Sequence, residues 1–105
     1  MAEYVTIRRW SLKEGADEAS LLTLVRDGIM PAYKAQPGCL SLQLFRVGEP
    51  ASYLAVTYWE GRAAYGSWAG EGGAAWRESY RPTLERWLEI MTFEQEFEAQ
   101  LLVSG

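Results

Sequence analysis

Aromatic side chains are the residues of this sequence best placed to do chemistry. Trp59 closes a run of aromatic and β-branched residues. An indole N–H can donate a hydrogen bond to a bound oxygen atom, and the indole face can stack on a planar aromatic ligand. Trp59 is therefore a candidate for a ligand pocket, with a place in the core or in an interface as the alternative.

Four more aromatic residues flank a glycine-rich stretch at residues 70–73: Tyr65, Trp68, Trp76 and Tyr80. They predict an aromatic-lined cavity for a planar apolar ligand, in which tyrosine hydroxyls supply the few polar contacts. The glycines would then form a mobile lid or entrance. The alternative is that the rings fill a core of short helices beside a plain loop. We take Trp68, Trp76, Tyr80 and Tyr33 as the candidate substrate-binding residues.

Two basic residues, Arg77 and Arg81, are four positions apart, so they share one face of a predicted helix. Such a pair is commonly solvated or paired with acidic neighbours such as Glu78 and Glu85. Alternatively, one of them points into the pocket and stabilises a phenolate or enolate, because a nearby cation lowers the pKa of a phenol.

Three glutamates, Glu94, Glu96 and Glu98, alternate along the last predicted strand, so we expect them on one face. They would either keep an exposed edge soluble or form ion pairs across the sheet or a dimer interface. The basic residues available for such pairs are Arg8, Arg9 and Arg46. Cys39 is expected to be a small buried hydrophobe rather than a nucleophile.

The amino-acid composition excludes several kinds of catalytic site, metal site and binding partner. The 105 residues include no histidine and one cysteine, so imidazole chemistry, an intrachain disulfide and a cysteine-cluster metal site are excluded. We expect no metal and no cofactor. A net charge of −4 without a basic block argues against nucleic-acid and membrane partners. With no signal peptide and no apolar run near the ~20 residues of a membrane span, we expect a cytoplasmic protein with a single domain over residues 1–105.

Hydrophobic periodicity and turn residues divide the chain into elements. Strands are predicted at residues 4–10, 39–47, 52–59 and 90–103, and helices at 18–33, 60–69 and 74–89. Asp17 can cap the first helix, Pro31 should end or kink it, and Pro82 should kink the last. A tight connection at residues 48–50 predicts a hairpin between the second and third strands.

This β-α-β-β-α-β order is typical of the ferredoxin-like α+β fold with an antiparallel four-stranded sheet. Helices on one face leave the other face of the sheet uncovered. In so short a chain that face is usually buried by association, so we expect a homodimer packed sheet to sheet, as a dimeric α+β barrel.

The residues Gln36-Pro-Gly-Cys-Leu-Ser41, Tyr58-Trp-Glu60 and Ser67-Trp68, together with the long last strand, resemble the antibiotic biosynthesis monooxygenase (ABM) family. The resemblance implies a dimeric α+β barrel with a ligand pocket between helices and sheet. Known members include cofactor-independent monooxygenases of quinols and anthrone-like aromatics, haem-degrading enzymes and proteins without an assigned activity.

Within this resemblance, Trp59 matches a pocket tryptophan and Tyr65 matches a tyrosine used by the monooxygenases. Arg77 and Arg81 are candidates for the assisting basic residue, and these four form the predicted catalytic set. Ala55 stands where the family has an asparagine, and the axial histidine of the haem-degrading branch is absent. The resemblance implies cofactor-independent oxygenation of a small electron-rich aromatic. The alternative is a non-catalytic ligand-binding or structural dimer.

Overall fold

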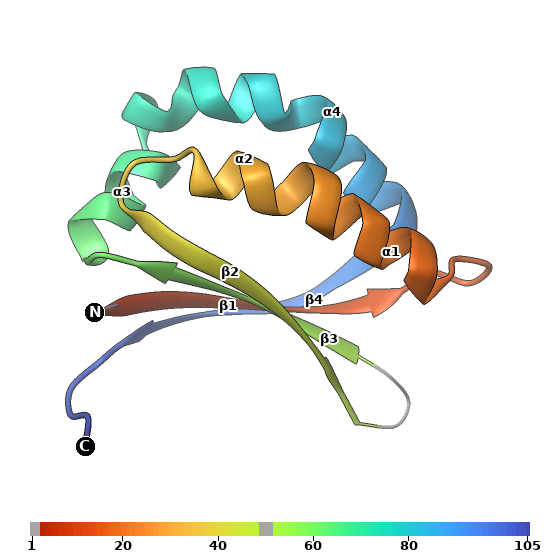
Figure 1. Ribbon diagram of the computed structural model, residues 1–105, viewed down its shortest axis with the longest axis horizontal. Helices are drawn as coiled ribbons and strands as arrows, with labels where there is room; N and C mark the ends of the chain where they lie inside the picture. Colours follow the sequence, from red (N-terminus) through yellow and green to blue (C-terminus); the bar gives the residue numbers. More distant parts are fainter. Residues whose placement is uncertain (1–2, 49–51) are drawn as a thin grey trace.

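A computed structural model describes residues 3–48 and 52–105 as a four-stranded antiparallel sheet under a layer of helices (Figure 1). The strands are β1 (Tyr4–Leu12), β2 (Cys39–Val47), β3 (Ser52–Trp59) and β4 (Met91–Gln100). They lie in the order β2-β3-β1-β4, which confirms the predicted α+β, ferredoxin-like fold. The β2–β3 hairpin also forms as predicted, although Glu49 and Pro50 of its connection lie outside the described residues.

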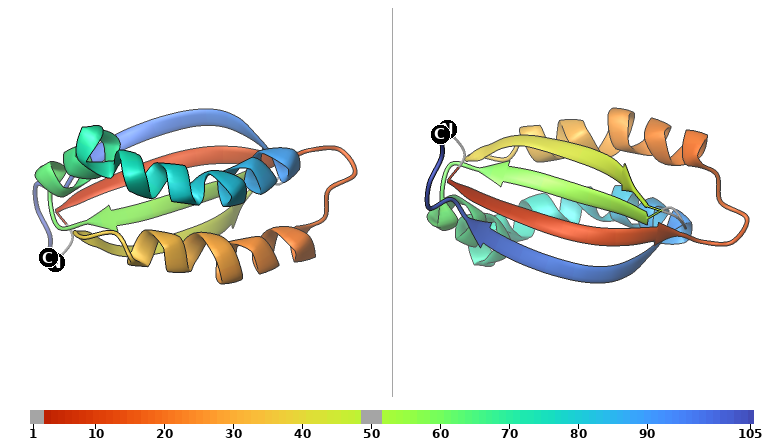
Figure 2. Two further views of the ribbon diagram at one scale, coloured as in Figure 1. Left: turned by 90° about the horizontal axis from the view of Figure 1, so that it is seen from above. Right: turned by 90° about the horizontal axis from the view of Figure 1, so that it is seen from below.

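The helices are α1 (Glu18–Leu24), α2 (Met30–Lys34), α3 (Arg62–Ala69) and α4 (Ala74–Ile90), with a π-helical turn η1 (Val25–Ile29) and a 3₁₀ turn η2 (Glu71–Gly73). All of them lie over one face of the sheet, which we call the covered face, and the view from below shows the opposite, open face (Figure 2). No helix in the described part of the chain is long and apolar enough to span a membrane.

The first helical segment begins and bends where the sequence indicates. The Asp17 carboxylate accepts the backbone N–H of Ser20 at 3.1 Å and so caps α1. Pro31 has no N–H to donate, and the segment widens into the π-helical turn just before it and then continues to Lys34. Pro31 therefore distorts the segment without ending it.

Side-chain alternation places different residues on the two faces of the sheet. Thr6, Arg8 and Trp10 of β1 point to the covered face, together with Tyr53, Ala55, Thr57 and Trp59 of β3. The open face carries apolar side chains such as Ile7, Phe45 and Phe97, and the last two are each 45% exposed. The core thus lies between helices and sheet.

The last strand corrects one prediction. The pairing of β4 with β1 shifts register between Arg9 and Trp10, so the strict alternation of the glutamates is interrupted. Glu94 accepts a hydrogen bond from Ser11 Oγ at 2.7 Å on the open face, whereas Glu96 meets Arg8 on the covered face. The expectation that Glu94, Glu96 and Glu98 share one face is therefore wrong, because a β-bulge cannot be read from alternation alone. Ile90 ends α4 rather than beginning the strand.

Candidate active site

A cavity lies between the covered face and the helices, and we call it the central cavity. Its inner part, of about 70 Å³, lies over β1, β2 and β3 beneath η1, α2 and α4. Its outer part, of about 260 Å³, extends toward Trp68, Arg77 and Phe93. Both parts are lined by the same five side chains: Arg8, Trp10, Tyr33, Tyr80 and Leu84. The walls are mainly apolar and aromatic, as in sites for small organic ligands.

Arg8 brings a positive charge to this cavity. It lies in the middle of β1, and its side chain is 22% exposed. Its Nη2 donates to Glu96 Oε1 at 3.1 Å, and its guanidinium carbon lies 5.7 Å from the centre of the Trp68 ring. Ala55, directly opposite on β3, has too short a side chain to cover Arg8.

The neighbours of Arg8 keep it charged, and burial keeps the nearby tyrosines neutral. Burial lowers the pKa of Arg8, but Tyr33, Glu96 and Tyr65 together raise it above its ordinary value. Burial raises the pKa of Tyr33, Tyr65 and Tyr80, and Arg8 offsets only part of that effect. At neutral pH these tyrosines are therefore hydroxyls that can donate hydrogen bonds.

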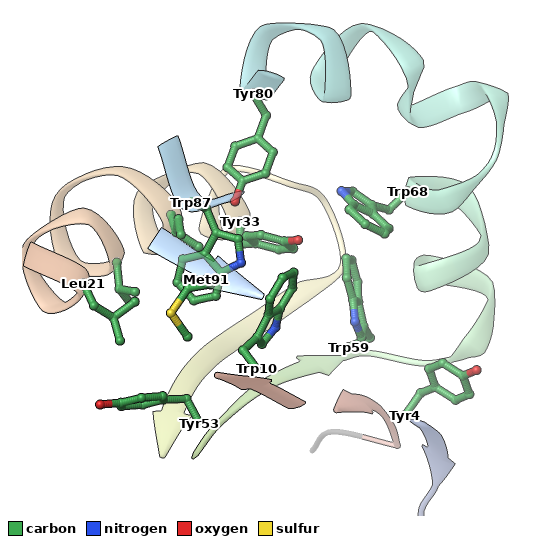
Figure 3. Close-up of a cluster of buried hydrophobic side chains, with 12 residues drawn as sticks. Tyr4, Trp10, Leu21, Tyr33, Tyr53, Trp59, Trp68, Tyr80, Trp87 and Met91 are labelled. Atoms are coloured by element: carbon green, nitrogen blue, oxygen red, sulfur yellow. The ribbon is translucent and has the colours of Figure 1, made fainter. Parts of the chain in front are cut away.

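The predicted substrate-binding residues are brought together. Tyr33 packs against Trp68, Trp76 and Tyr80 with ring centroids 5.3–5.8 Å apart, and Trp76 stacks on Tyr80 at 4.9 Å. Trp68, Tyr33 and Tyr80 line the central cavity (Figure 3). Trp76 lies behind them, and its indole N–H donates to the Ala32 carbonyl at 3.0 Å.

Trp59 and Tyr65 are placed beside the cavity rather than on its wall. Trp59 is 0% exposed, and its indole Nε1 lies 3.4 Å from Thr6 Oγ1. Its ring packs against Tyr65 and Trp68 at 5.5 and 5.7 Å. The Tyr65 hydroxyl lies 3.5 Å from Glu96 Oε1. Trp59 thus contacts Trp68, which lines the cavity, and Tyr65 meets Glu96, the ion-pair partner of the cavity residue Arg8.

The two predicted arginines point to different surroundings. The Arg77 guanidinium donates to the Trp68 carbonyl and, at 2.9 Å, to the Gly70 carbonyl, so it joins α4 to the end of α3 at the rim of the cavity. Gly73 permits this approach, since a Cβ there would overlap the Trp68 carbonyl. Arg81 is largely exposed and pairs with Glu78 at 2.6 Å. A spacing of four residues turns side chains by about 40°, enough to separate their partners.

Sequence reasoning missed Arg8 as a site residue, although it considered Arg8 as an ion-pair partner. The signal was present in the adjacent basic residues Arg8 and Arg9 within a strand. Successive strand residues face opposite ways, so one of the two had to point under the helices. Cys39 is half-buried rather than fully buried, and burial raises the pKa of its thiol to about 11, which disfavours the thiolate as expected. Among the described residues, no cluster of three or more His, Cys, Asp or Glu side chains could hold a metal ion.

Solved structures that are similar to this chain share its fold at low sequence identity. SnoaB, a cofactor-independent oxygenase from Streptomyces nogalater, is 15% identical over 99% of this chain and 97% of its own, with a TM-score of 0.73. HapK from Hahella chejuensis is 15% identical over 97% and 95%, with a TM-score of 0.75. The haem degrader MhuD from Mycobacterium tuberculosis, with two haems in its active site, is 23% identical over 97% and 98%, at 0.68.

The sequence itself identifies the family. No curated protein matches the chain. The family model of the antibiotic biosynthesis monooxygenases matches residues 3–79, a span that runs from β1 into α4 and includes most residues of the central cavity. The chain belongs to the antibiotic biosynthesis monooxygenase family.

Proposed function

We propose that this protein is a cofactor-independent monooxygenase of a small, planar, electron-rich aromatic compound such as a quinol or an anthrone-like molecule. The observation that carries the proposal is a cavity walled by aromatic rings with a half-buried cation, Arg8, among them. Family membership and the fold shared with SnoaB, itself a cofactor-independent oxygenase, support it.

The cavity supplies what such a reaction needs from the protein. Aromatic walls align a planar substrate, and a cation favours its ionised form by lowering the pKa of a phenol or enol. The anion then gives an electron to molecular oxygen directly. For an anthrone-like substrate, one oxygen atom becomes a ring carbonyl, and the other leaves as water with the two methylene hydrogens. The substrate provides all the electrons, so the equation balances without a reductant.

The predicted residues take different parts in this proposal. Trp68, Tyr33 and Tyr80 contact the substrate, and Trp76 supports them from behind. Trp59 and Tyr65 act as positioning residues through Trp68 and Glu96. Arg77 fixes the rim of the cavity, and Arg81 lies outside it, so the stabilising cation we assign is Arg8. The open apolar face of the sheet is the surface we propose for a homodimer.

A haem-degrading function is not supported by the residues present. The sequence contains no histidine, so imidazole ligation of haem iron is unavailable. The cavity wall is built from rings that pack on one another, and its larger part has a volume of about 260 Å³. That volume lies at the lower limit for a drug-sized ligand. We derive no step through haem.

A non-catalytic small-ligand-binding dimer is the second candidate. The observation that favours it is the lining of the central cavity, where no described residue is a carboxylate, an imidazole or a side-chain amide other than Gln43. Ala55 lies in the lining in place of the asparagine that the family resemblance implies. Without such a group, proton transfer from the substrate falls to solvent.

Oxygen consumption distinguishes the two candidates. The metal-stripped protein is supplied with a panel of quinols and anthrones, beside the variants Leu84→Trp and Leu88→Trp. Leu84 lines the cavity and Leu88 does not, yet both lie on α4 with similar exposure, 38% and 43%. We expect uptake above the autoxidation rate that is lost in Leu84→Trp and kept in Leu88→Trp. Uptake at the autoxidation rate for the whole panel would reject the oxygenase and leave the binding protein.

A further inference from the structure

We infer that the central cavity binds its ligand as an anion, with an ionised oxygen of a planar aromatic compound placed on the Arg8 guanidinium. We further infer that Glu96 is a resident counter-ion that competes with this oxygen. The inference rests on the proposed function in one respect only, the choice of the central cavity as the binding site.

Arg8 uses only part of its hydrogen-bonding capacity on a charged partner. A guanidinium has five N–H donors in a planar fork. Among the described residues, the ion pair of Arg8 goes to a single carboxylate, Glu96, through Nη2. The neutral hydroxyls of Tyr33 and Tyr65 also lie near the guanidinium, which offsets part of the rise in their pKa. The rest of the group borders a cavity whose described lining contains no carboxylate. A mostly buried cation that meets one carboxylate and otherwise neutral hydroxyls is incompletely compensated, and an anionic oxygen is the ligand that best satisfies it.

The indole N–H of Trp68 is a further hydrogen-bond donor in the wall of the same cavity. Trp68 lines the outer part, is 9% exposed, and its indole N–H has no acceptor among the described residues. Its nitrogen lies on the side of the ring that faces Tyr33 and Tyr80 (Figure 3). Buried donors without a partner are rare in folded proteins, and this one lies on the ring above Arg8. The nitrogen itself is buried, so the Trp68 ring has to turn for this N–H to reach an acceptor in the cavity.

The surroundings of Arg8 leave space for a ligand on the covered face of the sheet. Ala55 lies opposite Arg8 and leaves the covered side of the guanidinium unobstructed. The hydroxyls of Tyr33 and Tyr80 are neutral, so they add hydrogen-bond donors and no opposing negative charge. An aromatic carboxylate or phenolate therefore meets donors on the polar side and rings on the apolar side.

Glu96 acts in this proposal as the counter-ion of Arg8 when no ligand is bound. Glu96 comes from the edge strand β4, is 37% exposed and meets Arg8 from outside the cavity lining. It neutralises Arg8 in the empty protein and can turn to solvent when a ligand anion arrives. Its negative charge near the site also repels that anion. Removing the charge at Glu96 should therefore strengthen anion binding, the opposite of what removing Arg8 does.

The test uses two probes of one shape, 2-naphthoate and its neutral amide, 2-naphthamide. Neither has a phenol or an oxidisable methylene, so binding is measured apart from turnover, by calorimetry and quenching of tryptophan fluorescence. We expect the wild-type protein to bind naphthoate at least about ten-fold more tightly than naphthamide, as charge-assisted hydrogen bonds predict. Equal affinities, or no naphthoate binding at millimolar concentration, would overturn the inference.

The variants separate charge from fold. Arg8→Gln should lose about ten-fold in naphthoate affinity with little change for naphthamide, and Glu96→Gln should gain several-fold. Arg26→Gln, an exposed arginine away from the cavity lining, is the matched control and should bind like the wild type. If Arg8→Gln does not fold, Arg8→Lys and Glu96→Gln carry the test. Weaker naphthoate binding in Glu96→Gln would contradict the competition.

The two proposals fail separately. Selective naphthoate binding without oxygen uptake on any quinol or anthrone would keep the anion site and reject the oxygenase. Oxygen uptake that is undiminished in Arg8→Gln would keep the oxygenase and reject Arg8 as the anion-binding residue.

Discussion

The aromatic layer between sheet and helices has two regions that differ in how completely they are packed. Around Trp59 every polar group we describe is paired: Trp59 Nε1 with Thr6, and the Tyr4 hydroxyl with Glu98. Around Arg8 and Trp10, which lie on β1 about 13–20 Å along the sheet from the Tyr4–Trp59 pair, the layer opens into the central cavity, and the Trp68 N–H has no acceptor among the described residues.

The difference shows where a ligand site is to be sought in a small aromatic-rich protein. Aromatic rings gather at both regions, so ring density alone does not mark a site. Interiors are close-packed, and their polar groups are hydrogen-bonded. A ligand site is better indicated by a cavity that contains an unpaired polar group and lies beside a cation. The contrast between a closed region and an open one can be measured by substitutions in each.

The largest effect is expected at the centre of the closed region. Trp59→Ala should lower the free energy of unfolding by about 3–5 kcal/mol, since the indole is fully buried and its neighbours cannot fill the space. Leu84→Ala, at the rim of the cavity and 38% exposed, should cost about 1 kcal/mol or less. Urea denaturation followed by circular dichroism measures both. Equal losses would contradict the contrast.

Much of the fold was accessible from the sequence because local signals agree with one another. Strong alternation in residues 39–47, helical spacing after Asp17 and the turns between them specify the element order, and the order specifies the sheet. Two features escaped. The bulge in β4 depends on pairing with β1, and the 3₁₀ turn at Glu71–Gly73 replaces the break predicted there. The bulge depends on contacts between segments distant in sequence, and the turn depends on how the backbone of the two helices joins. Hydrophobic periodicity carries no information about either.

The site was predicted only in part, for a related reason. The rings of Trp68 and Tyr80, whose positions flank the glycine-rich stretch, do meet around a cavity, and the ring of Tyr33 joins them there. The basic side chain that lies beside these rings is decided by the direction of each arginine and by its hydrogen-bond partners. Arg77 is held by two carbonyls and Arg81 by Glu78, whereas Arg8 faces inward by strand alternation. A pattern of residue types does not record these directions.

A smaller effect compares two indoles of neighbouring helical elements, one paired and one not. Trp76→Phe removes the donor to the Ala32 carbonyl and leaves that acceptor unpaired, which should cost about 1–3 kcal/mol beyond the change in ring size. Trp68→Phe makes the same change in ring size but breaks no hydrogen bond among the described residues, so its cost should be lower by about that amount. Midpoints of urea unfolding measure the difference. An equal or larger loss for Trp68→Phe would contradict the prediction.

The smallest effect is a pH dependence that belongs to the closed region. The hydrogen bond to Glu98, followed by burial, raises the pKa of Tyr4 to about 12, against about 10 in an unfolded chain. Because the folded pKa is the higher one, this contribution to stability is fully present below about pH 10 and is lost as the pH rises from about 10 to 12. Tyr4→Phe lacks the hydroxyl, so its unfolding should not show this part of the loss. The other tyrosines titrate in both proteins and cancel in the comparison. The stability difference between wild type and Tyr4→Phe should therefore be constant up to about pH 10 and shrink above it. A difference that stays constant to pH 12 would mean that the Tyr4–Glu98 contact does not hold the phenol proton, and that the closed region is less completely paired than its geometry indicates.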